Sequence, residues 1–363
     1  MISDWSRAWR ARALLRPPVA GMPVDEAGPE SESEWVRRHH VRTDLAIEAR
    51  EVVVEQEGPP EIPGVKVSRE EVEGGSITRV DIESDAGSRI MGKVKGKYVT
   101  IEMPSLREHN SPLHEKTATL LGTEIRRFLN AWQLPPDAPV LLVGLGNWNA
   151  TPDALGPKVI ARCLITRHLF RYAPPQARDG LRPVAGVAPG VLGLTGMETS
   201  EIIQALVERF RPALVFCIDA LAARTVERLG TTVQISDAGI APGSGVGNRR
   251  RGITRDELGV PVLVIGVPTV IGAITIISDA WDRLSGRRSP QADLRPPGQP
   301  PGPGEASKEE TLKTLLGPYL GTMIVTPKEV DALIDDLAAV LAAGINVGLH
   351  PGFTLEDPFA TLQ

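Results

Sequence analysis

Short apolar runs alternate with stretches of helical period between residues 140 and 267, and this alternation constrains the fold more than any other feature of the sequence. The apolar runs, rich in Val, Ile and Leu, are 140–145, 184–187, 213–218, 233–235 and 260–267. The stretches 155–170, 198–210 and 221–229 repeat apolar residues every three or four positions. Nearly continuous apolar strands separated by helices are typical of a parallel sheet that is covered on both faces. We therefore predict an α/β fold with a doubly wound, mainly parallel sheet and helices on both faces.

A small β region is expected before this core. Short β-branched runs separated by glycines occur at 52–54, 65–67, 77–82 and 98–101. Their polar neighbours predict three or four antiparallel strands with one solvated face. An amphipathic helix over 113–132, which ends before Pro135, then opens the core. We place the small β region at 45–110 and the α/β core at 111–284.

The C-terminal part is expected to return to the core after an interruption. A helix is predicted over 271–284, followed by a Pro/Gly-rich loop at 285–306 whose composition cannot pack a core. Within 307–363, a strand at 323–325 precedes Thr326-Pro327-Lys328-Glu329, a pattern typical of a helix start with Thr326 as N-cap. Residues 1–44, in contrast, read as an N-terminal extension of charge blocks and prolines with little apolar periodicity.

Charge and composition exclude several classes of function. The chain has 40 basic and 45 acidic side chains, a net charge of −5, so no positive field would hold nucleic acid directly. No window approaches the roughly 18 uninterrupted apolar residues of a membrane span. The two cysteines cannot build a disulfide framework, and the chain reads as reduced and cytoplasmic. Neither cofactor nor metal is expected, since His114-Glu115 is followed by Ala118 where a second metal ligand would stand.

Two aspartates are the strongest candidates for chemistry. Asp153 follows the first strand of the predicted core, and Asp219 follows the strand at 213–218. Ligands of open α/β sheets collect beyond the carboxyl ends of the strands, so the two side chains could face one another there. Two close carboxyls would share one proton, and one could activate water while the other protonates a departing amine. Asp153 could alternatively be the N-cap of the helix that begins near Leu155.

Weaker candidates surround this pair. Gly144-Leu145-Gly146 begins a dinucleotide fingerprint, but Asn149 stands where its third glycine is needed. Asp237, in Asp-Ala-Gly, is either a turn residue or a supporting acid. The loop that ends in Arg249 and Arg250 could clamp an acidic substrate or form a solvated turn. The missing third glycine at Asn149 disfavours a nucleotide-dependent enzyme.

Several long strings resemble the germination protease family of spore-forming Firmicutes. They are VRTDLAIEARE (41–51), TPDALGPKVIARCLITRHLF (151–170), PGVLGLTGMETSEII (189–203), IDALAARTVER (218–228), QISDAGIAPGSGVGN (234–248) and MIVTPKEVD (323–331). The resemblance implies an atypical aspartic endopeptidase that degrades small acid-soluble spore proteins at germination. It also implies a fold similar to that of hydrogenase-maturation endopeptidases and a homotetramer. By motif, Asp153 and Asp219 are then the catalytic pair, and Glu198 joins Asp237, Arg249 and Arg250 as possible supporting or substrate-binding residues.

The resemblance further implies a zymogen that processes itself. The family's cleavage motif falls on Thr43–Glu48, which predicts cleavage between Asp44 and Leu45. Residues 1–44 would then be the propeptide and 45–363 the mature protease, acting in the cytoplasm of the forespore or in the spore core. Two alternatives stay open: a metal-assisted endopeptidase of the same fold, and a non-catalytic module that binds the proteins coating spore DNA.

Overall fold

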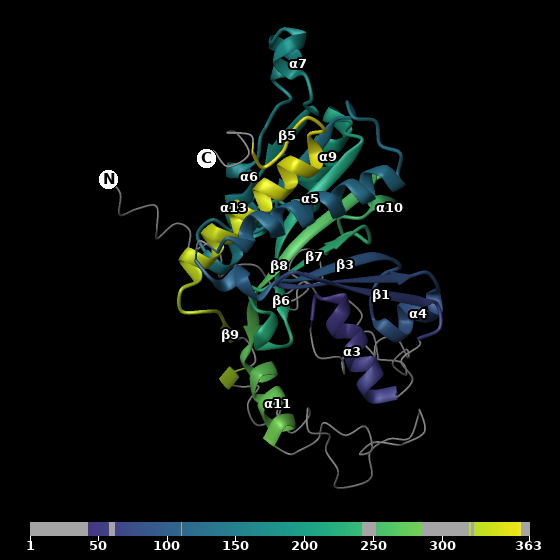
Figure 1. Ribbon diagram of the computed structural model, residues 1–363, viewed down its shortest axis with the longest axis vertical. Coiled ribbons are helices and arrows are strands. Elements are labelled where there is room, and N and C mark those ends of the chain that lie inside the picture. Colours follow the sequence, from purple (N-terminus) through teal and green to yellow (C-terminus); the bar gives the residue numbers. More distant parts are fainter. Residues whose placement is uncertain are drawn as a thin grey trace, which may run out of the picture. The chain divides into compact units, whose positions relative to one another are not determined.

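The computed structural model describes residues 43–57, 62–109, 111–241, 252–284, 319–320 and 323–356. The extension before residue 43, the Pro/Gly-rich loop 285–306 and the arginines Arg249 and Arg250 lie outside these residues. The described chain forms one α/β unit (Figure 1).

Nine strands of the described chain form one sheet, in the order β1-β2-β3-β7-β8-β6-β4-β5, with β9 paired to β8. The strands are β1 (Val65–Val72), β2 (Gly75–Ile82), β3 (Gly96–Glu102), β4 (Val140–Gly144), β5 (Val184–Val187), β6 (Leu214–Ala223), β7 (Thr232–Ser236), β8 (Val262–Gly272) and β9 (Ile324–Val325). β5, β4, β6 and β8 are mutually parallel, which confirms the predicted parallel core. The predicted antiparallel region β1–β3 is confirmed too, but it continues the same sheet, because β3 pairs with β7.

The prediction for 213–235 was wrong in two respects. Residues 221–229 were expected to be helical, whereas β6 continues to Ala223 and pairs with β8 across a bulge at Leu221/Ala222. Only a short 3₁₀ turn, η4 (Val226–Arg228), follows. Residues 224–231 are too few for the crossover of a dozen or more residues that a parallel strand needs, so β7 runs antiparallel to β8.

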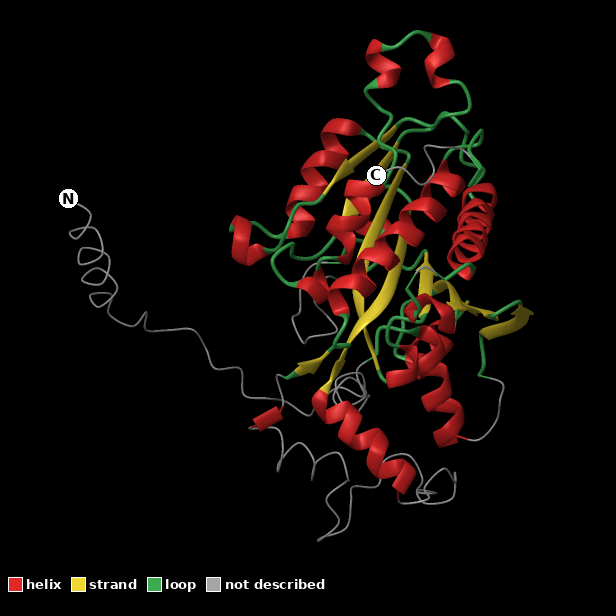
Figure 2. Ribbon diagram, turned by 60° about the vertical axis from the view of Figure 1, so that its left-hand side comes forward, coloured by secondary structure: helices red, strands yellow, loops and turns green. Residues whose placement is uncertain are grey.

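Helices cover both faces of the sheet, as predicted, and Figure 2 shows them on either side of the central strands. The α-helices are α3 (Ala46–Glu57), α4 (Asp85–Met91), α5 (Leu113–Ala131), α6 (Leu155–Arg162), α7 (Leu169–Tyr172), α8 (Leu192–Thr195), α9 (Thr199–Phe210), α10 (Arg255–Leu258), α11 (Ala273–Leu284) and α13 (Val330–Leu349). The other 3₁₀ turns are η1 (Pro104–Arg107), η2 (Thr151–Asp153) and η3 (Pro175–Arg178). α5, α6 and α13 pack on one face, against Leu142, Phe216 and Ile265. α9 packs on the other face, where Ile203 and Val207 contact Val215 and Cys217.

Three smaller predictions also need correction. Residues 52–54 lie in helix α3 and not in a strand. The predicted helix 155–170 breaks at Cys163, which is extended; the next backbone N–H, that of Leu164, donates to the Asn346 side chain at 2.9 Å. Thr326 does not cap α13, because its hydroxyl donates to the Thr269 carbonyl at 3.0 Å and the helix begins at Val330.

Helix α13 alone, within the described residues, is long and apolar enough to cross a membrane by length and composition. It lies against α5 and α6, and most of its length is buried inside the protein (Figure 1). Glycines 344 and 348 bring its backbone close to Leu121 and Ile125 of α5. Its apolar composition therefore follows from its place in the core.

Candidate active site

A pocket of about 550 Å³ lies on the α9 face of the sheet, beyond the end of β4. Its walls come from β6, β7 and β8, from the loop after β4, and from residues 92–94 before β3. Three acidic residues line it: Asp44, Asp153 and Asp219. The structure therefore brings both predicted catalytic aspartates, and the predicted cleavage position, to one cavity.

Asp219 lies inside strand β6 and not after its end, because the strand runs on to Ala223. β4 stops at Gly144, opposite Ile218, so Asp219 is next to the open end of its neighbour. The side chain is 8% exposed, and its Oδ1 accepts one hydrogen bond, from the Ala220 N–H at 2.9 Å. Burial raises the pKa of Asp219 well above its usual value, the negative charges of Asp153 and Asp44 raise it further, and the Ala220 N–H lowers it in part.

Asp153 closes the turn η2 and does not act as a helix cap, since Ala154 is the N-cap of α6 and no side chain caps that helix. Burial raises the pKa of Asp153 to about 6, against a lowering effect of the Asn147 N–H. Gly146 makes this turn possible: its φ is 109°, and a Cβ there would lie 2.0 Å from the Asp153 carbonyl oxygen. Gly146, in the loop after β4, thus serves the placement of Asp153.

The two carboxyls lack the partners that normally hold a buried charge. Within the described residues, neither Asp153 nor Asp219 forms an ion pair with Lys, Arg or His. The charge of Asp153 instead raises the pKa of Asp219, because like charges in a desolvated site repel. Groups linked in this way do not titrate independently.

Residues 43–45 run beside the end of β6 and lead into helix α3, and Asp44 lines the pocket. The Asp44 N–H donates to the Ala222 carbonyl at 3.1 Å, and the Ala222 N–H donates to Asp44 Oδ2 at 2.8 Å. Gln234 of β7 contacts the chain on both sides of the Asp44–Leu45 bond, at the Asp44 carbonyl (3.1 Å) and at the Ala46 N–H (2.7 Å). Lys93 Nζ donates to the Thr43 carbonyl at 2.7 Å.

The residues after this bond are buried as well. Leu45 and Ile47 pack against Leu221. The carboxylate of Glu48 has no exposed surface and accepts from the Arg224 N–H (2.8 Å), the Thr225 N–H (3.1 Å) and the Thr225 hydroxyl (3.2 Å). Hydrogen bonds to a carboxylate are stronger than those between neutral groups. The segment is therefore held by side chain and backbone contacts over its whole length.

Sequence reasoning did not single out Gln234, Lys93 or Glu48 as contacts of this segment. Gln234 offered a signal, since it is a polar side chain in the apolar run 233–235, and such a residue needs a partner when the strand is buried. Lys93 and Glu48 offered no comparable signal, because charged residues in polar stretches are usually solvated.

The remaining predicted residues lie elsewhere. Glu198 precedes helix α9, where its N–H donates to the Glu201 carboxylate at 3.3 Å. Asp237 follows β7 in a turn, where its carboxylate accepts from the Lys97 N–H at 2.6 Å and burial raises its pKa. Neither residue lines the pocket of Asp153 and Asp219. Among residues 43–57, 62–109, 111–241, 252–284 and 323–356, no three His, Cys, Asp or Glu side chains lie together as a metal site would require.

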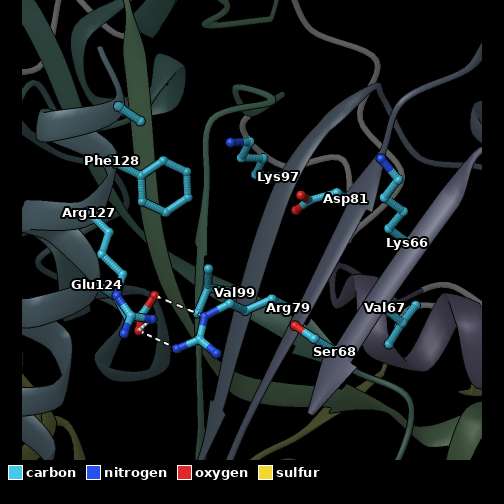
Figure 3. A pocket seen from close by; sticks show the side chains of 11 residues that line it. Lys66, Val67, Ser68, Arg79, Asp81, Lys97, Val99, Glu124, Arg127 and Phe128 are labelled. Carbon is cyan, nitrogen blue, oxygen red and sulfur yellow. Dashed lines mark hydrogen bonds and ion pairs between the residues drawn. The ribbon is translucent and has the colours of Figure 1, made fainter. Parts of the chain in front are cut away.

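A second pocket, of about 290 Å³, lies between the strands β1–β3 and helix α5 (Figure 3). Figure 3 shows the Arg79 guanidinium turned toward the Glu124 carboxylate. This carboxylate is buried and accepts from Arg79 at 2.6 Å and from Arg127 at 2.7 Å. Glu124 is thus paired with two cations, unlike Asp153 and Asp219 of the first pocket.

The fold and the first pocket define an α/β protein with two acidic side chains that lack a cation partner, at the open end of a mostly parallel sheet. A pair of acids of this kind is typical of hydrolytic enzymes. Comparison with known proteins narrows this class. The family model described as germination protease matches residues 46–288 and 303–358, and the chain belongs to this family.

Relatives named germination protease share much of their sequence with this chain. That of Caldanaerobacter subterraneus subsp. tengcongensis is 48% identical over 86% of this chain and 95% of its own length. That of Clostridium perfringens is 44% identical over 88% and 98%, and that of Bacillus subtilis 42% identical over 89% and 96%. A solved structure, the [NiFe] hydrogenase maturation protease HycI from Thermococcus kodakarensis, matches 42% of this chain and 92% of its own at 18% identity. Its TM-score of 0.25 is too low to support an argument.

Proposed function

We propose that this protein is the endopeptidase that begins the degradation of small acid-soluble spore proteins at germination, with Asp153 and Asp219 as its catalytic pair. Family membership supports the activity. One structural observation carries the mechanism: the segment around the Asp44–Leu45 bond lies in the pocket that both aspartates line. A peptide bond and two acids that share a proton are the components of aspartic hydrolysis.

The chemistry follows from the protonation of the pair. Because the pKa of Asp219 is well above its usual value and that of Asp153 is about 6, one carboxyl is protonated while the other is ionised. The ionised carboxylate takes a proton from water as the water oxygen bonds to the Asp44 carbonyl carbon. The protonated carboxyl gives its proton to the Leu45 nitrogen as the C–N bond breaks. The roles belong to the pair, so neither residue is assigned one of them.

The same geometry supports self-processing. The bond between Asp44 and Leu45 is part of the chain itself, so residues 43–48 act as a tethered substrate. Cleavage there would release the propeptide 1–44 and leave a mature protease that starts at Leu45. We further propose that the protein works as a homotetramer in the cytoplasm of the forespore and in the spore core, which family resemblance supports.

Mass spectrometry of the full-length protein after incubation at acidic pH tests this proposal. The unsubstituted protein should acquire an N-terminus at Leu45, whereas Asp153→Asn and Asp219→Asn should stay intact while keeping their circular dichroism and melting behaviour. Asp81→Asn, in the second pocket, is the matched control and should be processed normally. Processing at another bond would contradict cleavage between Asp44 and Leu45. Normal processing of either Asn variant would show that its aspartate is not catalytic.

Two further experiments distinguish the proposed protease from a non-catalytic binding module and from a metal-assisted endopeptidase. Incubation with an acid-soluble spore protein should give fragments, and an uncut substrate that remains bound would indicate a binding module. Activity should survive a chelator, and its loss, restored by a divalent metal, would indicate metal-assisted hydrolysis. Light scattering of the purified protein reports the oligomeric state.

A further inference from the structure

Gln234 is an unusual residue for its position. It lies in the middle of β7, and its neighbours Val233 and Ile235 point into the main core on the opposite face. Its own side chain is 7% exposed and faces the pocket. A buried side-chain amide needs a donor for its oxygen and an acceptor for its NH₂ group, and the identity of these partners indicates the role of the residue.

The amide has two partners, and both belong to the segment that carries the bond between Asp44 and Leu45. The Ala46 N–H can only donate, so the atom that accepts it at 2.7 Å must be Oε1. The Nε2 group is then directed at the Asp44 carbonyl oxygen, 3.1 Å away. The orientation of the amide is thus set by the backbone it holds, and its N–H reaches the oxygen of the bond to be cut.

Gln234 also has a fixed relation to the acids. Asp219 pairs with Gly266 of β8, and Gly266 pairs with Gln234, so the three residues form one row across three strands. Residues paired in this way point to the same face of a sheet, and neighbouring strands lie about 4.8 Å apart. Gly266 carries no side chain, and the Leu221 side chain lies over it, 2.6 Å from where a Cβ would stand. The acid and the amide both line the pocket, on either side of Gly266, and the Asp44 carbonyl is bound to the amide.

We infer that Gln234 is a catalytic residue that polarises the carbonyl of the bond being cut and stabilises the charge that forms on its oxygen. The inference rests on the proposed function. As the water oxygen bonds to the carbonyl carbon, the π electron pair moves onto the carbonyl oxygen, where the Nε2–H donates to it. The pair returns to re-form C=O when the C–N bond breaks. The bond from Ala46 to Oε1 keeps the amide in place throughout, so no reorganisation is needed.

The Gln234 contacts are made to backbone atoms alone. A protein substrate that enters the pocket as residues 43–46 do would present the same two atoms, whatever its side chains. We therefore expect Gln234 to act in the cleavage of substrate proteins as well as in self-processing, without contributing to sequence preference.

The first test is the rate constant of self-cleavage in the full-length chain, which depends on no binding step. Gln234→Met keeps the length of the side chain and removes the donor, and cleavage should slow about 100-fold, as for loss of one oxyanion donor. Thr100→Val is the matched control. Thr100 pairs with Gln234 in the same row, is fully buried, and does not line the pocket, so this variant should be processed at the unsubstituted rate.

The second test is Gln234→Glu. If the role of Gln234 were purely structural, the rates of this variant and of Gln234→Met would depend on pH in the same way. An ionised carboxylate accepts from Ala46 but cannot donate to the Asp44 oxygen; the protonated acid can do both. The rate relative to the unsubstituted protein should therefore rise as the pH falls, whereas the ratio for Gln234→Met should stay flat. The other titratable groups that line the pocket are present in all three proteins, so the ratio for Gln234→Met controls for their own titration: Asp44, Lys93, Tyr98, Asp153 and Asp219.

Each outcome decides something. Unsubstituted protein that does not cut Asp44–Leu45 overturns the proposed function and the role of Gln234 together. Normal self-cleavage in folded Gln234→Met overturns the role of Gln234 and leaves the function standing. If Gln234→Met does not fold, the pH ratio of Gln234→Glu decides alone, and a flat ratio overturns the donor role.

Discussion

Two buried acids in this protein have opposite surroundings. Glu124, in the pocket of Figure 3, is 2% exposed and binds two arginines. Asp219 is 8% exposed and receives one backbone N–H, with two further carboxylates nearby. The first arrangement surrounds the carboxylate with cations, and its ion pair with Arg79 joins the sheet to helix α5. The second destabilises the charged form and keeps a proton available.

The comparison shows that burial alone does not mark a reactive acid. What separates the two sites is whether the protein supplies a cation, since an unpaired charge is costly to bury and a paired one is not. The active pocket gives up stability in this way, as catalytic sites commonly do. Glu48 is a third case, in which hydrogen-bond donors add to a cation: the Arg224 and Thr225 N–H groups donate to its carboxylate, and the Arg228 guanidinium lies 3.8 Å away.

Among these three buried acids, the largest effect is expected at Glu48, which tests whether its donors hold the tethered substrate. Glu48→Ala removes four hydrogen bonds to a buried carboxylate, from the Thr43 hydroxyl, the Arg224 N–H and the Thr225 N–H and hydroxyl, and at roughly 2–3 kcal/mol in total we expect self-cleavage to slow on the order of 50-fold. Glu51→Ala is the matched control on the same helix. Glu51 is partly exposed and binds Arg228, but among the described residues its side chain has no hydrogen bond to residues 43–48, so its loss should leave the cleavage rate nearly unchanged. Equal effects of the two substitutions, measured by gel densitometry over time, would contradict this role.

Neutralising the two acids should change stability in opposite directions. Glu124→Gln leaves Arg79 and Arg127 without their shared partner, and the free energy of unfolding in urea at pH 7 should fall by about 2 kcal/mol. Asp219→Asn removes an unfavourable charge, so the same measurement should give a value equal to or above that of the unsubstituted protein. A fall in both variants would show that Asp219 has a stabilising partner.

A smaller effect concerns pH. The folded protein holds the Asp153 proton up to about pH 6, whereas the unfolded chain releases it near 3.8. The folded state therefore binds more protons between these values, and the free energy of unfolding should fall as the pH rises from 4 to 7. With allowance for partial exposure, the Asp153 contribution is about 1–2 kcal/mol. In urea titrations of Asp153→Asn, the fall in the free energy of unfolding between pH 4 and 7 should be smaller by that amount. An unchanged fall would contradict the raised pKa of Asp153.

The smallest effect is expected at Arg127. Its side chain is 56% exposed and bonds to Glu124 one helical turn away. Such pairs contribute about 0.3–0.5 kcal/mol. Arg127→Ala should lower the unfolding free energy by that amount at low salt and by less in 1 M salt. If the loss were as large as that of Glu124→Gln, Arg127 rather than Arg79 would be the main cation partner of Glu124.

Much of the fold could be predicted from local patterns. The apolar runs 140–145 and 184–187 became strands and 113–132 became a helix, because their side chains repeat with the period of the element that buries them. The runs 221–229 and 52–54 were misread because short apolar stretches fit either period. Their outcome was decided by partners, β8 for the former and the cluster of Val80 and Tyr98 for the latter.

The order of residues determined which acids stand near strand ends, where the chain turns and which helices have a face to bury, because these are properties of neighbouring residues. The tertiary structure alone decided that β7 reverses direction, that β6 continues past Asp219, and that Asp44 meets Ala222 and Gln234. Those outcomes join residues far apart in the sequence, and the contacts of Asp44 with Ala222 and Gln234 span 178 and 190 positions. They depend on which strand lies beside which, and hydrogen bonds between strands carry that information where local periodicity does not.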